Sequence, residues 1–295
     1  MSQPPLFHHV CIIGIGLIGS SLARALRKYG LAHKIMICDA SEYNLNQAKK
    51  LYLGDEYTHS VTEAVKGCDL VVLATPVGTF GTIAQDIAPH LIKNAILTDV
   101  GSVKAVMENE VKPHLKADTI MIGGHPVAGT EYSGPKAGFA ELFEDRWCIL
   151  CPDDNAPNAA IEKLRQLWSA VKSQVSIMPA ARHDEVLAIT SHLPHLIAWT
   201  IVGTAADMEE RTKGDVIRFS ASGFRDFTRI AASDPIMWRD VFLNNKTAVL
   251  ETLGRFSEDL TMLQRAIRDE DGAALEKHFS RGREIRKRII DAGQS

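Results

Sequence analysis

Short apolar runs alternate with helical stretches over the first 178 residues of the chain. The apolar runs are rich in Val and Ile and have the length of buried strands. Amphipathic stretches with helical spacing lie between them and are separated by prolines. This alternation predicts an α/β fold in which helices cover a parallel, doubly wound sheet of the Rossmann type. The predicted strands are Val10–Ile13, Ile35–Cys38, Leu70–Ala74, Ala95–Thr98, Thr119–Ile122, Trp147–Leu150 and Val175–Ile177, and the clearest helices are Leu17–Tyr29, Val77–His90 and Ala156–Val171.

The pattern changes after Pro179, where strand-like alternation ends and helical periodicity continues to the C-terminus. A chain of 295 residues is also long enough for two domains. We therefore predict two domains, an α/β domain at residues 1–179 and an all-helical domain at residues 180–295. Ligand pockets favour the junction between two such domains.

Two apolar features of the second region need a packing partner. The stretch Val186–Ala206 contains no Asp, Glu, Lys or Arg, yet its Ser, Thr, His and Pro residues favour a buried interface helix over a membrane span. A seam with apolar spacings of four, three, four, three and four consists of Val249, Leu253, Phe256, Leu260, Leu263 and Ile267. Packing within one chain is the simpler explanation for the seam, but because the uncharged helix also needs a partner, we favour a homodimer.

Composition and charge restrict the partners. Hydrophobic residues make up 45% of the chain and charged residues 23%, which is typical of globular proteins. The formal net charge of −3 provides no basic field, so neither nucleic acid nor a membrane surface is an expected partner. Five cysteines, an odd number, favour free thiols in a reducing cytoplasm, and Met1–His9 lacks the pattern of a signal peptide. Cys148 and Cys151 lie in a predicted strand that points their thiols to opposite faces, so we interpret them as core residues.

A glycine-rich loop predicts the cofactor. Gly14-Ile15-Gly16-Leu17-Ile18-Gly19 follows the first predicted strand and opens the first helix. In this context Gly14 makes the tight turn, Gly16 lets the backbone approach phosphate, and Gly19 permits close packing. The helix N-terminus at Leu17 and Ile18 then faces the pyrophosphate of a nicotinamide dinucleotide.

The identity of the dinucleotide depends on Asp39, which ends the second predicted strand. Its carboxylate can accept hydrogen bonds from both hydroxyls of the adenosine ribose, and it would repel the extra phosphate of NADP. NAD is therefore favoured over NADP, although Asp39 could instead cap the next helix. Thr75 and Pro76 follow the third strand at the same sheet edge, where they contact the cofactor or form a plain turn.

Two further strand ends contain polar residues that packing alone does not favour. Ser102 follows the fourth predicted strand, and His125 follows the fifth between glycines and Pro126. Both should lie at the sheet edge that also contains the glycine loop. A histidine beside a reacting alcohol can accept its proton because the ordinary pKa of histidine lies near neutrality. A buried histidine with only a packing role is the alternative.

At this point the sequence strongly resembles the prephenate and arogenate dehydrogenase family of tyrosine biosynthesis, over essentially the whole chain. The resemblance depends on the glycine loop and on four further motifs, Asp99-Val100-Gly101-Ser102-Val103-Lys104, Gly124-His125-Pro126-Val127-Ala128-Gly129-Thr130-Glu131, Ser191-His192-Leu193-Pro194-His195 and Gly223-Phe224-Arg225-Asp226-Phe227-Thr228-Arg229-Ile230-Ala231.

The resemblance implies hydride transfer to NAD from the ring carbon that bears the hydroxyl group, with loss of the ring carboxylate and aromatisation. It implies that His125 accepts the hydroxyl proton and that Ser102 hydrogen-bonds in the same cluster. Arg229 matches the arginine that binds the anionic substrate, for which a planar guanidinium is well suited. Arg225 is the fallback for this role.

The resemblance also assigns the remaining pocket residues. His195 would lie beside the nicotinamide with His192 in support, and Thr130 and Glu131 would line the pocket entrance. His192 and His195 are three residues apart, as in some metal sites, but no nearby ligand completes such a site, so no metal is predicted.

Two other functions remain as alternatives. A 3-hydroxyacid dehydrogenase would need a helical lysine followed by an asparagine four residues later, and the sequence lacks that order. A non-catalytic NAD-sensing dimer would need neither His125 nor Arg229. The sequence does not distinguish prephenate from L-arogenate as substrate, and it leaves feedback by L-tyrosine open.

Overall fold

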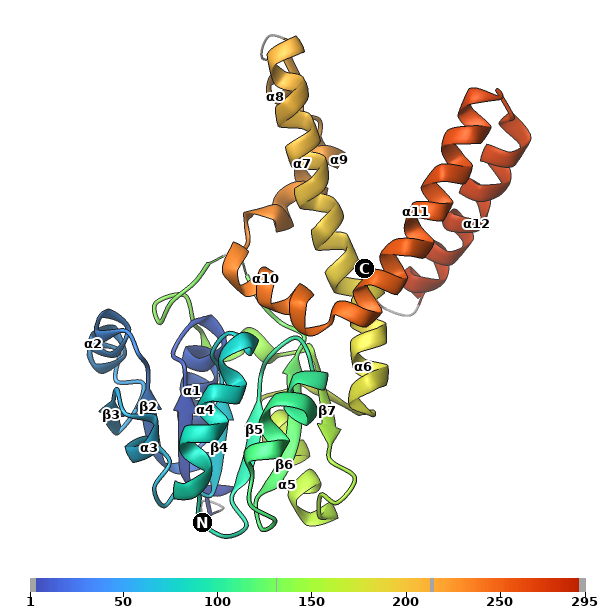
Figure 1. Ribbon diagram of the computed structural model, residues 1–295. Coiled ribbons are helices and arrows are strands. Elements are labelled where there is room, and N and C mark those ends of the chain that lie inside the picture. Colours follow the sequence, from blue (N-terminus) through green and yellow to red (C-terminus); the bar gives the residue numbers. More distant parts are fainter. Residues whose placement is uncertain (1–3, 131, 213–214, 292–295) are drawn as a thin grey trace. The chain divides into compact units, whose positions relative to one another are not determined.

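The computed structural model describes residues 4–130, 132–212 and 215–291, and it divides into two compact units. The first unit extends to Lys246 and contains the sheet, the helices that cover it and the helices that follow it (Figure 1). The second unit begins at Thr247 and is helical.

Eight strands form one sheet in the order β3-β2-β1-β4-β5-β6-β7-β8. The strands are β1 (Phe7–Ile13), β2 (Ala32–Cys38), β3 (Glu56–Thr58), β4 (Leu70–Leu73), β5 (Ile96–Asp99), β6 (Ile120–Pro126), β7 (Trp147–Pro152) and β8 (Gln174–Ile177). The strand order changes direction at β1, so the carboxyl ends of β1 and β4 flank the crevice where doubly wound sheets bind ligands. The predicted fold class and all seven predicted strands are confirmed.

Two features of the sheet differ from the prediction. The edge strand β3 was missed because it has only three residues, none of them buried. Strand β7 runs antiparallel to β6, whereas a wholly parallel sheet was predicted. Among the described residues between these two strands, the one-turn helix Ala140–Phe143 is the only helix, so the chain reverses direction without a helix that crosses the sheet.

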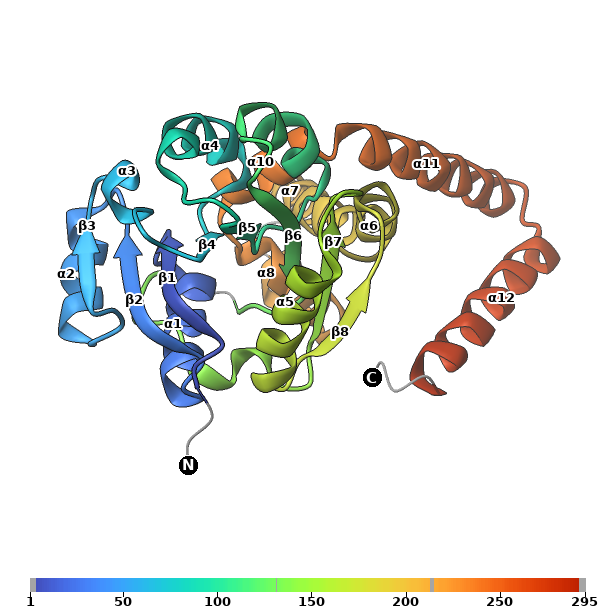
Figure 2. The same ribbon diagram turned by 90° about the horizontal axis from the view of Figure 1, so that it is seen from below.

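Alternate residues of β1 belong to two apolar cores on opposite faces of the sheet. Val10 and Ile12 pack with residues of α1 and α5, whereas Cys11 and Ile13 pack with residues of α4 (Figure 2). The covering helices are α1 (Leu17–Lys28), α2 (Glu42–Lys50), α3 (Val61–Ala64), α4 (Phe80–Ile87) and α5 (Asn158–Ala170), and one-turn helices lie at Val77–Thr79, Ala88–His90, Met107–Val111 and Lys112–His114.

The rest of the first unit is helical, as predicted for the chain after Pro179. Its helices are α6 (Ala180–Leu187), a wide turn at Ala188–His192, α7 (Leu193–Thr212), α8 (Asp215–Arg218), α9 (Ser222–Thr228), the turn Arg229–Ala232 and α10 (Pro235–Asn244). Ala180–Met208 is long and apolar enough to cross a membrane by length and composition alone, and only 28% of its most apolar window is buried. Ile189 and Ile201 are among its exposed residues.

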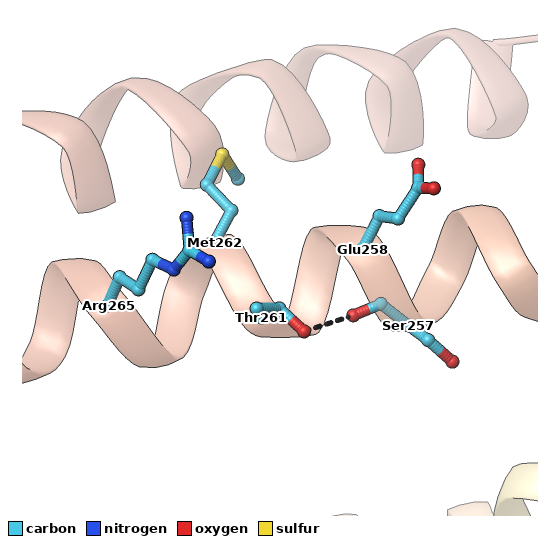
Figure 3. A pocket seen from close by; sticks show the side chains of 5 residues that line it. All are labelled: Ser257, Glu258, Thr261, Met262 and Arg265. Atoms are coloured by element: carbon cyan, nitrogen blue, oxygen red, sulfur yellow. Dashed lines mark hydrogen bonds between the residues drawn. The ribbon is translucent and has the colours of Figure 1, made fainter.

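The second unit consists of α11 (Lys246–Arg268), apart from its first residue, and α12 (Gly272–Asp291). The predicted apolar seam lies on α11, where Leu260 and Ile267 are exposed. A shallow hollow lies along the same helix, and its lining residues are Ser257, Glu258, Thr261, Met262 and Arg265 (Figure 3).

Candidate active site

The glycine loop between β1 and α1 has the geometry of a phosphate-binding turn. Gly14 has a φ of +98°, and a Cβ atom there would lie 2.6 Å from the carbonyl carbon of Ala74. A Cβ atom on Gly19 would collide with the Gly14 carbonyl, whereas one on Gly16 would meet no atom within 4 Å. No side chain caps α1 and its first turn contains no acidic residue. The first backbone N–H groups of α1, from Leu17 and Ile18 onward, can therefore receive a pyrophosphate.

Asp39, just beyond the end of β2, binds the glycine loop directly. Its Oδ2 accepts a hydrogen bond from the Ile15 backbone N–H at 2.8 Å, and its Oδ1 accepts one from Ser41 N–H at 2.8 Å. The N-cap of α2 is Ser41, whose hydroxyl accepts from Asn44 N–H. Asp39 Oδ1 also accepts from Asn44 Nδ2 at 3.3 Å, so Oδ2, with one donor, retains a lone pair for a ribose hydroxyl. His59, which sequence reasoning missed, also lies here: its Nδ1 bonds to the Asp39 carbonyl at 2.9 Å, and its Nε2 pairs with Glu42.

Thr75 and Pro76 lie next to the glycine loop. The backbone nitrogen of Thr75 would lie 2.8 Å from a Cβ atom on Gly14. The Thr75 hydroxyl bonds to that of Thr79 at 2.8 Å, and Thr79 Oγ1 donates to the Pro76 carbonyl at 2.7 Å. The structure therefore places both residues at the edge where the dinucleotide is predicted.

A buried ion pair joins the ends of β5 and β6. Asp99 and Lys104 are both fully buried and contact one another. Lys104 Nζ also donates to the Gly124 carbonyl at 2.6 Å, and Asp99 Oδ1 accepts from Gly124 N–H at 3.0 Å. Burial raises the pKa of Asp99, and the ammonium of Lys104 opposes that rise. This pair anchors the loop that contains Ser102 to the backbone just before His125; the motif was visible in the sequence, but this role was not.

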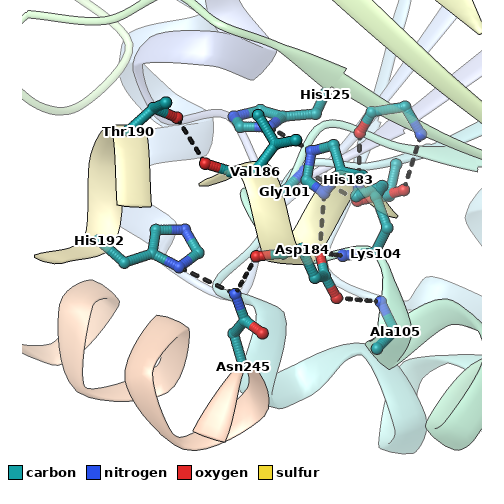
Figure 4. Close-up of polar contacts among 12 residues, drawn as sticks. Gly101, Lys104, Ala105, His125, His183, Asp184, Val186, Thr190, His192 and Asn245 are labelled. Atoms are coloured by element: carbon teal, nitrogen blue, oxygen red, sulfur yellow. Dashed lines mark hydrogen bonds and ion pairs between the residues drawn. The ribbon is translucent and has the colours of Figure 1, made fainter. Parts of the chain in front are cut away.

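His125 belongs to a row of three buried polar side chains. Its Nδ1 lies 2.8 Å from His183 Nε2, and His183 Nδ1 lies 2.7 Å from Asp184 Oδ1. Figure 4 shows the three side chains pointing toward one another from β6 and α6. Burial, followed by the charges of His183, Lys104 and His192, holds the pKa of His125 well below its ordinary value of 6.5. The His125 ring is therefore neutral at neutral pH and can act as a base.

His192 extends the same buried cluster. Asn245 Nδ2 donates to the Asp184 carbonyl at 2.8 Å and to His192 Nδ1 at 3.1 Å. Burial lowers the pKa of His192 to about 4, and contact with the Ser102 backbone opposes this change. The structure thus places the Ser102 backbone at His192, and it places His192 near enough to His125 to influence its pKa. Sequence reasoning missed Asn245, His183 and Asp184.

His195 and Arg229 form a second part of the site. The His195 ring stacks on Trp238 with centroids 3.7 Å apart, and its Nδ1 bonds to the Ser191 carbonyl at 2.9 Å. Burial lowers the pKa of His195, and the positive charge of Arg229 lowers it further. Arg229 is exposed at the end of α9. A half-buried imidazole and an exposed guanidinium therefore lie close enough to interact.

The loop after β6 is the least constrained part of the predicted site. Thr130 is exposed, and its hydroxyl accepts from Tyr132 N–H at 3.3 Å. Glu131 lies outside the described residues.

The five cysteines are buried free thiols, and Cys148 and Cys151 belong to different apolar clusters, as predicted. In the part of the chain that the structure describes, no group of three or more His, Cys, Asp or Glu residues could bind a metal ion.

Fold and site together define a dinucleotide-binding α/β protein with a buried, neutral histidine at its ligand edge and an added helical region. Two family models match the chain: the nucleotide-binding domain of prephenate dehydrogenase over residues 22–177, and the dimerization domain of prephenate dehydrogenase over residues 179–281. The chain therefore belongs to the prephenate dehydrogenase family.

Known relatives cover nearly the whole chain. The cyclohexadienyl dehydrogenase of Zymomonas mobilis is 42% identical over 95% of this chain and 96% of its own length. The prephenate dehydrogenase of Bacillus subtilis is 33% identical over 94% of this chain and 75% of its own length. The crystal structure of Aquifex aeolicus prephenate dehydrogenase with hydroxyphenyl propionate and NAD+ matches with a TM-score of 0.88 and 34% identity, over 98% of this chain and 99% of that one.

Proposed function

We propose that this protein is an NAD-dependent dehydrogenase that oxidatively decarboxylates prephenate, L-arogenate or both in tyrosine biosynthesis. The products would be 4-hydroxyphenylpyruvate and L-tyrosine respectively. The observation that carries this proposal is the neutral His125 at the sheet edge that also contains the glycine loop. Relatives named cyclohexadienyl and prephenate dehydrogenase support it, as does the NAD+ complex of the Aquifex aeolicus enzyme.

Each proposed site residue has a defined task. His125 is the catalytic base that takes the proton of the ring hydroxyl, and Ser102 hydrogen-bonds beside it. When bound, NAD supplies the hydride acceptor. Arg229 binds a carboxylate of the substrate, His195 and His192 shape the pocket, and Thr130 and Glu131 lie at its entrance. The dinucleotide is bound by Gly14, Gly16, Leu17, Ile18 and Gly19, with Asp39 at the ribose and Thr75 and Pro76 alongside.

The direct test is NADH formation, followed by its absorbance, with prephenate and with L-arogenate as substrates and with NAD and NADP as cofactors. We expect NADH with at least one substrate and a preference for NAD. Tight NAD binding without turnover of either substrate would instead indicate a non-catalytic sensor.

Replacing Arg229 with Ala should raise the KM for prephenate by about tenfold to a hundredfold, because a charge-assisted contact to a carboxylate contributes about 1.5–3 kcal/mol. We expect a smaller change in kcat, since this contact is already present in the bound substrate. Steady-state kinetics measure both constants. Arg225→Ala is the matched control: if it raises KM while Arg229→Ala does not, Arg225 is the anchor.

Replacing Asp39 with Ala should raise the KM for NAD at least about tenfold, since the ribose loses hydrogen bonds to a charged acceptor. The loss of charge should also reduce the difference between the KM for NAD and the KM for NADP. The KM for prephenate at saturating NAD serves as the internal control and should change little. An unchanged KM for NAD would disprove the assignment.

The assembly and setting of the enzyme follow from the same proposal. Residues 1–179 act as the NAD-binding domain, and residues 180–295 bind substrate and form a homodimer. The exposed apolar side chains of α7 and α11 and the family's dimerization domain support the homodimer. Five free thiols suit the reducing cytoplasm. Feedback by L-tyrosine would act at the substrate pocket, because L-tyrosine has the same amino-acid side chain as L-arogenate and a hydroxyl at the same ring position.

A further inference from the structure

The carboxylate of Asp184 is surrounded by hydrogen-bond donors. Its Oδ1 accepts from Lys104 N–H at 2.7 Å, and its Oδ2 accepts from Ala105 N–H at 2.7 Å. His183 Nδ1 is the third neighbour, also at 2.7 Å from Oδ1. Because an ionised carboxylate only accepts, it suits three donors, whereas a protonated one would point its own hydrogen at one of them. The nitrogen that faces it, His183 Nδ1, must therefore carry a proton.

The proton on His183 Nδ1 determines the role of the other nitrogen in that ring. His183 is fully buried, and burial lowers its pKa despite the opposing effect of Asp184. The ring is therefore neutral, and its Nε2 is an acceptor. That acceptor lies 2.8 Å from His125 Nδ1, so His125 Nδ1 must be the donor.

We propose that Asp184 and His183 are positioning residues that keep the proton of the His125 ring on Nδ1, so that Nε2 is the atom that accepts the substrate's hydroxyl proton. This inference rests on the proposed function of His125. A neutral imidazole can carry its proton on either nitrogen, and the partner of one nitrogen decides which. Without His183, a part of the His125 population would have Nε2 protonated and would be unable to act as a base.

In the proposed reaction the hydroxyl proton passes to His125 Nε2 while the hydride passes from the same ring carbon to NAD. The bonding pair left by carbon dioxide then completes the aromatic ring and leaves a phenolate. The proton then returns from Nε2 to the phenolate oxygen. While His125 carries the additional proton, its Nδ1–H bond to His183, which is itself bonded to ionised Asp184, stabilises the positive charge.

Other charged and titratable groups near His125 do not replace this arrangement. The ammonium of Lys104 is paired with Asp99, and His192 is held by Asn245. The Cys148 thiol on β7 faces the His125 backbone, and burial raises its pKa well above its ordinary value, so it stays protonated. His183 is thus the side chain that directly contacts the His125 ring nitrogen.

The first experiment determines the tautomer of the His125 ring in the absence of substrate. Multiple-bond 1H–15N spectra of protein with 15N-labelled histidine distinguish a protonated Nδ1 from a protonated Nε2, and the His125 signals are identified by their loss in His125→Asn. We expect His125 to be protonated at Nδ1 in the wild-type protein. Protonation at Nε2 would overturn the proposal.

The second experiment compares replacements of His183. In His183→Gln the amide oxygen can take the place of Nε2 and accept from His125, so kcat should stay within about tenfold of wild type. In His183→Asn the shorter side chain removes that acceptor, and kcat should fall by about 100-fold or more as the general-base contribution is lost. The KM values for both ligands should change little, because His183 is fully buried. His114→Gln, at an exposed histidine, controls for the substitution itself.

The outcomes separate this inference from the proposed function. Equal losses in the Gln and Asn variants, with the Nδ1 proton of His125 retained, would mean that His183 only packs, and would overturn the proposal. If His125→Asn keeps wild-type turnover, the proposed function fails whatever the tautomer. If His125→Asn is inactive and the wild-type His125 is protonated at Nε2, the proposed function stands and only the positioning role of His183 and Asp184 fails.

Discussion

Replacing His125 with Asn is expected to lower kcat by about 100- to 10,000-fold, which is the usual contribution of a positioned general base. Asparagine is polar and similar in size, but it cannot take the hydroxyl proton. Binding should change far less, since Arg229 still provides the positive charge for the substrate. Steady-state NADH formation gives kcat, and calorimetric titration of the variant with prephenate gives the dissociation constant.

The pH dependence of the wild-type enzyme provides a check on the same role. The neutral ring of His125 is the active form, and the pKa of this group in the folded protein lies well below 6.5. Activity should therefore persist as the pH falls through 6.5 and decline only at lower pH. An acid limb at or above 6.5, or a His125→Asn variant with near-wild-type turnover, would show that another group is the base.

Replacing Lys104 with Met should lower the free energy of unfolding by about 3–5 kcal/mol, because it leaves the fully buried carboxylate of Asp99 without its partner. The Gly124 carbonyl would lose its donor as well. Urea denaturation of wild type and variant measures the difference. The double variant Asp99→Asn/Lys104→Met is the matched control. Its free energy of unfolding should fall less than that of the single variant, since no unpaired charge remains.

The same variant should show a characteristic pH dependence. Burial raises the pKa of Asp99, and without Lys104 nothing comparable opposes that rise. A raised pKa in the folded state favours the protonated form, so the variant should recover stability as the pH falls and lose it as the pH rises through that pKa. If Lys104→Met lowers the free energy of unfolding by less than about 1 kcal/mol at neutral pH, the pair contributes no more than an exposed ion pair and the prediction is wrong.

The sequence was sufficient to predict the ligand edge because its components follow directly from strand ends. The glycine loop, Asp39, Ser102 and His125 each come within a few residues of an apolar run, and parallel strands bring such ends to one edge. The direction of β7 could not be predicted in this way. This strand is as apolar as a parallel strand, and only the lack of a long crossover helix before it indicates that it runs antiparallel to β6.

The partners of His125 could not be predicted in the same way. His183 lies 58 residues further along the chain, and its contact depends on how α6 packs against the end of β6. Periodicity shows which residues share a helix face but not which strand end that face meets. One signal was available in the sequence: His183 and Asp184 are adjacent polar residues just before the uncharged stretch Val186–Ala206. In the structure both residues are buried.

The segment between β6 and β7 also has a consequence for how the pocket can diversify. Its two ends are joined by a hydrogen bond from Val127 N–H to the Trp147 carbonyl at 2.7 Å, and Phe139 N–H bonds to Ser21 on α1. Because closure entropy grows slowly, doubling a loop costs only about 0.6 kcal/mol. If Thr130 lies at the pocket entrance as proposed, insertions or deletions around it would reshape that entrance for a different substrate side chain while the register of the strands stays unchanged. This segment is therefore a natural target for loop grafting.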